Sequence, residues 1–145
     1  MSRIAVVDTS VVAKWFFDEP HARHAQGLLG DEWELHAPDF LDLELDHVVA
    51  KRYRRGELTD EEGARVRAAF AEFPIHRHRS HSLRDDAFEL ACLHRRGIYD
   101  ALFVAVALVL GAKLVTADRR LHDALADQPV VGDALLWIED LPAAG

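Results

Sequence analysis

Cysteine occurs once in the 145 residues, at Cys92, so an internal disulfide is excluded. A chain of this length that folds without disulfides suits a reducing compartment, and we expect a cytoplasmic protein. The single thiol is expected to be a small buried hydrophobic side chain, because unpaired cysteine is among the most buried residue types.

Apolar stretches are short. The run Ala101–Leu110 has ten residues, which is about half of the roughly 20 residues needed to span a bilayer. The N-terminal residues lead directly into a short strand-like run without the apolar core of a signal peptide, so we expect neither export nor a membrane partner. The length predicts a single domain that buries about two-thirds of its unfolded surface.

Positive charge is scarce: 17 Lys and Arg stand against 25 Asp and Glu, for a net charge of −8. A negative field of this size repels phosphate, so the overall charge argues against nucleic acid as a partner. A nucleic-acid-binding function would need local positive charge or bound metal ions.

Short apolar runs alternate with helical patterns along the chain. The continuous run Arg3–Val7 is typical of a strand buried on both faces. The predicted strands are 3–7, 34–37, 74–76, 114–116, 130–131 and 136–138. The predicted helices are 9–16, 20–29, 38–55, 59–73, 82–96, 101–110 and 121–125. This alternation predicts an α/β fold with a parallel sheet covered on both faces.

The stretch Ile98–Asp118 is the most informative part of the chain. Asp100 precedes an apolar helix, Gly111 begins a tight turn, and a short strand then leads to Asp118. A helix and strand joined by a tight turn run antiparallel, so the helix start and the strand end meet. We therefore expect Asp100 and Asp118 to lie close together.

Two more acids are expected at the same edge. Asp8 ends the first strand, and Glu44 lies in the first turns of the helix after the second strand. On a helical wheel Glu44 falls about 60° from Leu41 and so borders the buried stripe, whereas Asp42 and Asp46 point toward solvent. Ligands of parallel α/β sheets bind where the strands end, which is this edge.

Each acid has a simpler explanation when taken alone. Asp8 and Asp118 are suitable helix N-caps, Asp100 suits a helix dipole, and Glu44 suits a position beside the core. Together they form a cluster of like charges that a cation would neutralise. Oxygen ligands without cysteine or histidine favour Mg²⁺ or Mn²⁺ over zinc. The expected chemistry is metal-assisted attack of water on a phosphodiester.

Three segments carry a family resemblance: VVDTSVV around Asp8, PDFLDLELDHVVAK around Glu44, and YDALFVAVALVLGAKLVTADRRL around Asp100 and Asp118. Together they resemble a PIN domain, and more narrowly the VapC toxins of bacterial type II toxin–antitoxin systems. The resemblance covers nearly the whole chain. It implies a single PIN domain over residues 1–141 with a short tail at 142–145, and a three-layer α/β/α fold with a central, mostly parallel sheet.

The resemblance also implies a function. Such proteins are endoribonucleases that use Mg²⁺ or Mn²⁺, usually form homodimers, and are inhibited by a cognate VapB antitoxin. The implied site residues are the acidic metal ligands Asp8, Glu44, Asp100 and Asp118, with the polar supporting residues Thr9, Ser10 and Thr116. One departure is His47, which stands where the family more often has an asparagine that helps to order the site.

Arg119 and Arg120 directly follow Asp118, so among the basic residues they are the best candidates to contact RNA phosphates. For the basic run Lys51–Arg55, the preferred interpretation is a cationic helix C-terminus that complements the helix dipole. Other candidate arginines are Arg77, Arg79, Arg95 and Arg96. The histidine-rich segment His76–His81 matches no familiar zinc spacing, and we expect a solvated loop or strand there.

Two other functions are compatible with parts of the pattern. A catalytically silent PIN-like module would bind RNA or a protein, although four intact acids disfavour it. A phosphotransfer enzyme or receiver domain would use Asp8 as its phosphoacceptor. The residue two positions after Asp8 is Ser10, where phosphatases of that kind usually have a second Asp.

Overall fold

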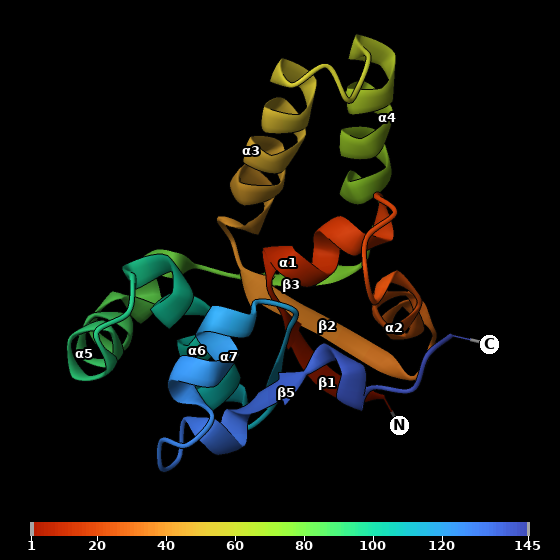
Figure 1. Cartoon of the computed structure of the whole chain (residues 1–145). Coiled ribbons are helices and arrows are strands. Elements are labelled where there is room, and N and C mark those ends of the chain that lie inside the picture. Colours follow the sequence, from red (N-terminus) through yellow and green to blue (C-terminus); the bar gives the residue numbers. More distant parts are fainter. Residues whose placement is uncertain (1, 145) are drawn as a thin grey trace.

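A five-stranded sheet forms the centre of the computed structural model, which describes residues 2–144 (Figure 1). Its strands run in the order β3-β2-β1-β4-β5, and every neighbouring pair is parallel. The strands are β1 Arg3–Val7, β2 Trp33–Pro38, β3 Ile75–His78, β4 Lys113–Thr116 and β5 Leu135–Trp137. The predicted α/β class with a parallel sheet is confirmed.

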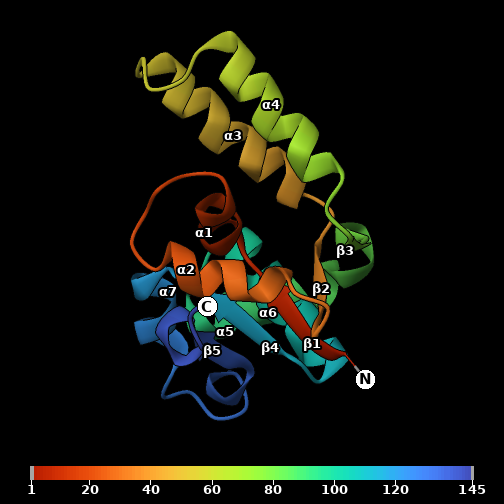
Figure 2. The ribbon, with the colours of Figure 1, turned by 90° about the vertical axis from the view of Figure 1, so that its right-hand side faces the viewer.

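Helices cover both faces of the sheet, which gives the predicted three layers. The α-helices are α1 Thr9–Val12, α2 Ala22–Gln26, α3 Leu41–Arg54, α4 Asp60–Ala71, α5 Arg84–His94, α6 Ile98–Leu110 and α7 Arg119–Leu125. Helix α6 packs across β1, β2 and β4, with α5 against its outer side, while α1 and α2 lie on the opposite face (Figures 1 and 2). The α3–α4 hairpin projects away from the sheet (Figure 2).

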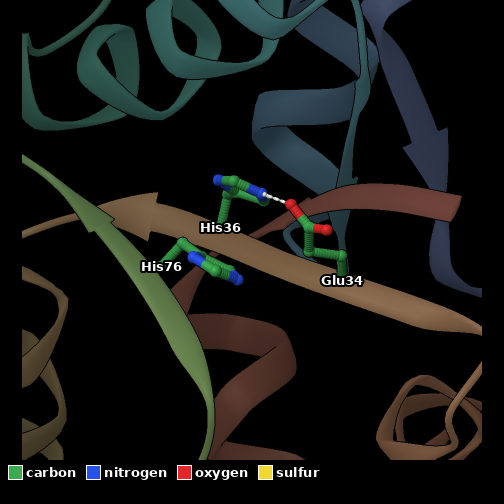
Figure 3. Close-up of side chains that lie close together, drawn as sticks. All are labelled: Glu34, His36 and His76. Atoms are coloured by element: carbon green, nitrogen blue, oxygen red, sulfur yellow. Dashed lines mark hydrogen bonds and ion pairs between the residues drawn. The ribbon is translucent and has the colours of Figure 1, made fainter. Parts of the chain in front are cut away.

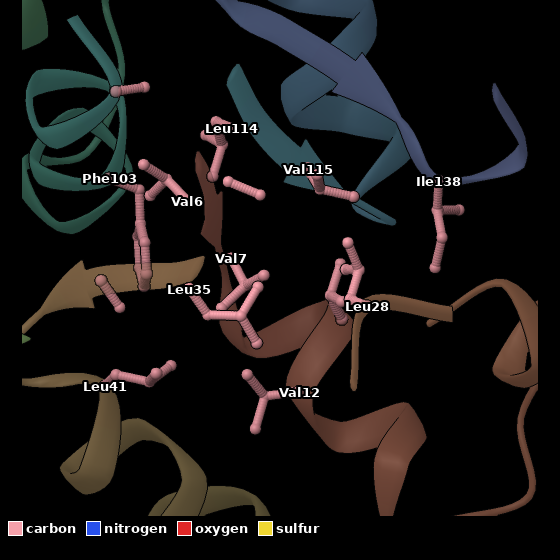
Figure 4. Close-up of a cluster of buried hydrophobic side chains, with 14 of the residues drawn as sticks. Val6, Val7, Val12, Leu28, Leu35, Leu41, Phe103, Leu114, Val115 and Ile138 are labelled. Atoms are coloured by element: carbon pink, nitrogen blue, oxygen red, sulfur yellow. The ribbon is translucent and has the colours of Figure 1, made fainter. Parts of the chain in front are cut away.

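The core is built around β1, whose central residues are buried on both faces. Val6 lies beside Phe103 of α6, whereas Val7 and Leu35 point toward Val12 on the other face (Figure 4). All five side chains are at most 5% exposed. The continuous apolar sequence of β1 follows from this position, because a central parallel strand has no face in contact with water.

The predicted helix after position 100 is confirmed and begins slightly earlier, at Ile98 with Gly97 as its N-cap. Residues Ala101–Ala107 are all buried, so the helix is apolar nearly all round. Gly111 ends it with a φ of 61°. This left-handed conformation suits glycine and turns the chain back into β4. None of the helices in residues 2–144 has the length and apolar character needed to cross a membrane.

Two expectations from the sequence are wrong. Val130–Val131 is not a strand but part of a turn, in which Val130 has a φ of 67°, and the last strand is β5. Cys92 is exposed rather than buried, because it lies on the outer side of α5. The tail is tied down as far as Ala144, which exchanges two hydrogen bonds with Arg23. Gly145 lies outside the described residues.

Candidate active site

The expected edge of the sheet brings the functional segments together. Strands β1 and β4 are hydrogen-bonded neighbours, with Val7 paired to Val115, so the residues that follow them emerge side by side. Asp8 follows β1 directly, and Asp118 comes two residues after β4. Glu44 and Asp100 lie in the first turns of α3 and α6.

Asp8 is almost completely enclosed, with 6% of its surface exposed, and both of its carboxylate oxygens accept hydrogen bonds. Its Oδ1 accepts from the Ser10 hydroxyl and from the backbone N–H of Val11 at 3.2 Å. Its Oδ2 accepts from the Thr116 hydroxyl at 2.5 Å. The side chain therefore has one fixed orientation, and it also caps α1, as the simpler explanation proposed.

Burial raises the pKa of Asp8 from 3.8 to about 6, even though the hydrogen bonds from Ser10, Thr116 and Val11 favour the charged form. The negative charge of Asp118 raises this pKa further. A buried carboxylate beside another carboxylate is costly to keep charged, and a cation at this position would reduce that cost.

Ser10 and Thr116 also join the two loops of the site. The Ser10 hydroxyl accepts from the backbone N–H of Ala117, and the Thr116 hydroxyl accepts from the backbone N–H of Asp118, both at 3.0 Å. Each hydroxyl thus donates to Asp8 and accepts from the loop after β4. The polar residues predicted beside the acids do lie there, and they hold the two loops in register.

Glu44 is half-buried and accepts a hydrogen bond from Thr9, at the start of α1. Partial burial raises its pKa, the bond from Thr9 opposes that rise, and the charge of Asp100 adds to it. His47 lies one turn further along α3 and lines the same surface depression as Thr9, Glu44 and Tyr99. His47 therefore borders the site, at the position where the family resemblance implies an asparagine that helps to order it.

Partial burial also raises the pKa of Asp100, while Arg96 opposes the shift. The Arg96 guanidinium lies 3.6 Å from the Asp100 carboxylate. The charge of Asp118 also raises the pKa of Asp100. Such an effect is expected if the two carboxylates lie near each other, as the sequence predicted. From the sequence, Arg96 was predicted only as one of several basic residues that could contact RNA. The four-residue spacing between Arg96 and Asp100 could have indicated this ion pair, because such pairs are common within helices. Helix α6, however, begins only at Ile98, after Arg96.

The charges of the four carboxylates act on one another in pairs, Asp8 with Asp118, Asp118 with Asp100, and Asp100 with Glu44. Within residues 2–144, no three of them bring oxygens within 4.8 Å of one another. Mg²⁺ usually keeps several waters and takes only one or two carboxylates, with substrate phosphate completing its shell. This spacing and the all-oxygen donor set fit Mg²⁺ or Mn²⁺ better than an ion that needs a closed cage of protein ligands.

The two arginines predicted to contact RNA have different surroundings. The Arg119 guanidinium lies 3.8 Å from the centre of the Trp137 ring and 3.8 Å from the Glu139 carboxylate. Its charge is therefore already engaged. Arg120 is exposed, and its side chain makes no hydrogen bond or ion pair with the described part of the chain. Of the two, Arg120 is the one whose guanidinium has no such partner within the described residues.

Sequence comparison identifies the family. The profile of the PIN domain matches residues 5–126, which is most of the chain. The chain belongs to the PIN-domain family. Ribonuclease VapC3 of Pyrobaculum aerophilum is 34% identical over 120 residues, which cover 81% of this chain and 92% of VapC3. Ribonuclease VapC12 of Mycobacterium tuberculosis is 30% identical over 117 residues, covering 80% and 88%. Within the family the chain is a VapC ribonuclease, which is a hydrolase.

Solved PIN-like structures share the whole architecture. The crystal structure of PAE2754 from Pyrobaculum aerophilum superposes with a TM-score of 0.69, covering 97% of this chain and 93% of that chain at 19% identity. A toxin–antitoxin complex from Klebsiella pneumoniae gives 0.62, covering 91% and 95% at 15% identity. At these identities the likeness establishes the fold, and it agrees with the layers described above.

Proposed function

We propose that this chain is an Mg²⁺-dependent endoribonuclease, with Mn²⁺ as a substitute, and that it is the toxin of a VapBC-type toxin–antitoxin pair. The observation that carries the proposal is the Asp8 carboxylate. It is buried, held on both oxygens by Ser10 and Thr116, and placed at an edge with three other acids. The ribonuclease names of the relatives support the reaction, and the donor chemistry supports the metal.

The proposed division of labour follows the contacts. Bound Mg²⁺ supplies an activated water and neutralises charge on phosphate oxygens. The acids Asp8, Glu44, Asp100 and Asp118 hold the ion. Thr9, Ser10 and Thr116 fix the carboxylates with their hydroxyls. Arg120 contacts an RNA phosphate at the margin of the site, where its guanidinium is free.

We also propose two protein partners. The first is a VapB-type antitoxin, which the toxin–antitoxin complex among the structures of this fold supports. Leu43 and Tyr99 are 70% and 60% exposed and line the depression beside Glu44, so a partner that covers them would also cover the acids. The second is another copy of this chain, for which exposed Leu93 and Val109 on α5 and α6 offer an apolar surface.

The deciding experiment is cleavage of purified total RNA by the antitoxin-free protein in Mg²⁺, Mn²⁺ or EDTA. We expect discrete fragments in either metal, none in EDTA, and a rate at least about 100-fold lower in Asp100→Asn, because one ligand charge is removed. The matched control is Asp31→Asn, which removes an exposed carboxylate away from the site and should cleave like the wild type.

Wild-type cleavage by Asp100→Asn, or undiminished cleavage in EDTA, would contradict the proposed chemistry. Absence of cleavage by folded wild-type protein in Mg²⁺ and in Mn²⁺ would favour the binding module instead. In that case RNA retention by the same protein in a filter-binding assay would identify it as one.

A further inference from the structure

A second group of ligand-type side chains lies on the sheet, outside the acidic edge. Glu34 and His36 come from β2, and His76 and His78 come from the edge strand β3. Alternate residues of a strand share a face, and the parallel register sets His36 opposite His76. The four side chains therefore occupy one face, and Figure 3 shows Glu34, His36 and His76 gathered over the two strands.

Three of these residues are close enough to share one ion. Glu34, His36 and His76 each offer a ligand atom within 4.8 Å of the other two, and they form the only such trio of acids, histidines or cysteine in residues 2–144. His36 Nε2 lies 2.7 Å from Glu34 Oε1. The His36 and His76 rings lie 4.6 Å apart and are nearly parallel, at 19°.

His36 is placed to be the fixed ligand of the group. It is 7% exposed, whereas the Glu34 side chain is 41% exposed and His76 is exposed. Its second ring nitrogen, Nδ1, lies 2.8 Å from His78 Nε2. Histidines that bind metals usually donate a hydrogen bond from the nitrogen that does not bind the metal, and this bond orients the ring. His78 is the acceptor for that role.

We propose that Glu34, His36 and His76 form a second metal site, which binds Zn²⁺. Two imidazoles and one carboxylate suit zinc, and this donor set leaves a fourth tetrahedral position open to solvent. Tetrahedral zinc at its usual bond lengths places ligand atoms about 3.3 Å apart. Binding would require the exposed His76 and Glu34 side chains to adjust from their present spacing around the buried His36.

The proposal is independent of the ribonuclease assignment. None of its residues belongs to the acidic edge, and its nitrogen donors select a different metal from the oxygen donors there. A zinc ion at this position would bridge β2 to β3, which lies at the edge of the sheet and connects α4 to α5. Zinc would then stabilise the folded chain by binding it in preference to the unfolded chain.

Calorimetric titration of the whole protein with Zn²⁺, in millimolar Mg²⁺ that occupies the acidic edge, tests the site. We expect one zinc per chain and a melting temperature that rises with zinc concentration. His76→Ala and Glu34→Gln should each weaken binding at least 10-fold and remove the thermal shift. His81→Ala is the matched control, because it deletes an exposed histidine outside the trio and should bind like the wild type.

Three results would overturn the proposal. The first is no saturable zinc binding by the wild type in Mg²⁺. The second is equal affinity in His76→Ala and His81→Ala. The third is a zinc equivalent that disappears in Asp8→Asn but persists in His76→Ala and Glu34→Gln, which would assign the ion to the acidic edge. Melting curves without zinc establish that each variant is folded before it is titrated.

Discussion

Asp8 caps α1, and this role does not exclude the metal-ligand role proposed for it, although its sequence position presented the two as alternatives. Its Oδ1 caps α1 through the Val11 N–H, and its Oδ2 is held by Thr116 across the sheet edge. Asp118 likewise caps α7, through Oδ1 alone. A carboxylate that caps a helix is fixed by the backbone, and such a group makes a well-oriented ligand. Helix capping by Asp8 and Asp118 is therefore compatible with the metal binding proposed for them.

The raised pKa of Asp8 predicts how stability depends on pH. The folded state, with a pKa of about 6, binds the Asp8 proton more tightly than the unfolded chain, with a pKa near 3.8. The stabilisation is complete below the lower pKa and is lost as pH rises through the higher one. Without divalent metal, the unfolding free energy of the wild type should fall by about 2.4 kcal/mol between pH 4 and pH 7, relative to Asp8→Asn.

Urea unfolding of both proteins in EDTA at a series of pH values measures this difference. The comparison with Asp8→Asn cancels the titration of the other acids and histidines. A gap between the two proteins that does not change with pH would mean that burial of Asp8 imposes no such cost. Adding Mg²⁺ at pH 7 should stabilise the wild type more than the variant, because the wild type has the extra ligand charge.

At the level of helices and strands, the sequence predicted most where hydrophobic patterning is unambiguous. The apolar segments of β1 and α6 indicated their structure, and parallel topology then placed Asp8, Glu44, Asp100 and Asp118 at one edge. The surroundings of individual side chains and the ends of elements were harder to predict from the sequence. The apolar stripe of α5 did not reveal that Cys92 faces outward, and two β-branched residues at 130–131 suggested a strand where the chain turns.

The zinc candidate illustrates a limit of a different kind. As a linear segment, His76–His81 has no familiar zinc-ligand spacing. The trio instead depends on a register that pairs His36 with His76, and it skips the intervening 39 residues. No local pattern encodes which residues of two parallel strands stand opposite each other, because their pairing is fixed by packing far along the chain.

The end of α6 gives a test of backbone conformation. Gly111 has a φ of 61°, and a Cβ atom built there meets no atom within 4 Å. Gly111→Ala should therefore destabilise the protein by about 1 kcal/mol through the left-handed conformation alone. Thermal or urea unfolding measures the loss. Gly30→Ala is the control, since Gly30 has equally open surroundings and a φ of −80°.

If Gly111→Ala lowered the unfolding free energy no more than Gly30→Ala does, the turn would have relaxed to accept a side chain. The position matters beyond stability, because this turn sets the direction of β4. Thr116 and Asp118 reach the acidic edge only if β4 runs back alongside α6.

Across the described part of the molecule, six of the 17 Lys and Arg side chains form ion pairs with acids. Several arginines lie in ion pairs with acids of neighbouring elements, namely Arg52–Glu19, Arg67–Asp46, Arg77–Asp42 and Arg119–Glu139. With a net charge of −8, the molecule as a whole repels the RNA backbone, although basic side chains such as Arg54 and Arg55 remain exposed. Recognition of RNA would then depend on few phosphate contacts and on the metal site.

This charge distribution predicts a weak salt dependence. Single-stranded nucleic acid loses affinity with a slope of about −0.7 per neutralised phosphate on a log–log plot against salt. For cleavage-deficient Asp100→Asn binding its RNA in Mg²⁺, we expect a slope shallower than about −2. Arg120→Gln in that background removes about one phosphate contact, so the slope should become shallower by about 0.7. Fluorescence anisotropy over a salt series measures both, and a slope steeper than about −4 would reveal a basic surface that the structure does not predict.

The position of β1 has a consequence for synthesis of the protein. β1 is the first strand made, but one of its two neighbours, β4, begins 110 residues later, at Lys113. The Thr116 hydroxyl that holds Asp8, and Asp118 itself, come later still. A nascent chain that ends before this segment has Asp8, Glu44 and Asp100 but cannot assemble the proposed catalytic edge. The proposed catalytic edge could therefore assemble only after the ribosome had synthesised the chain as far as Asp118.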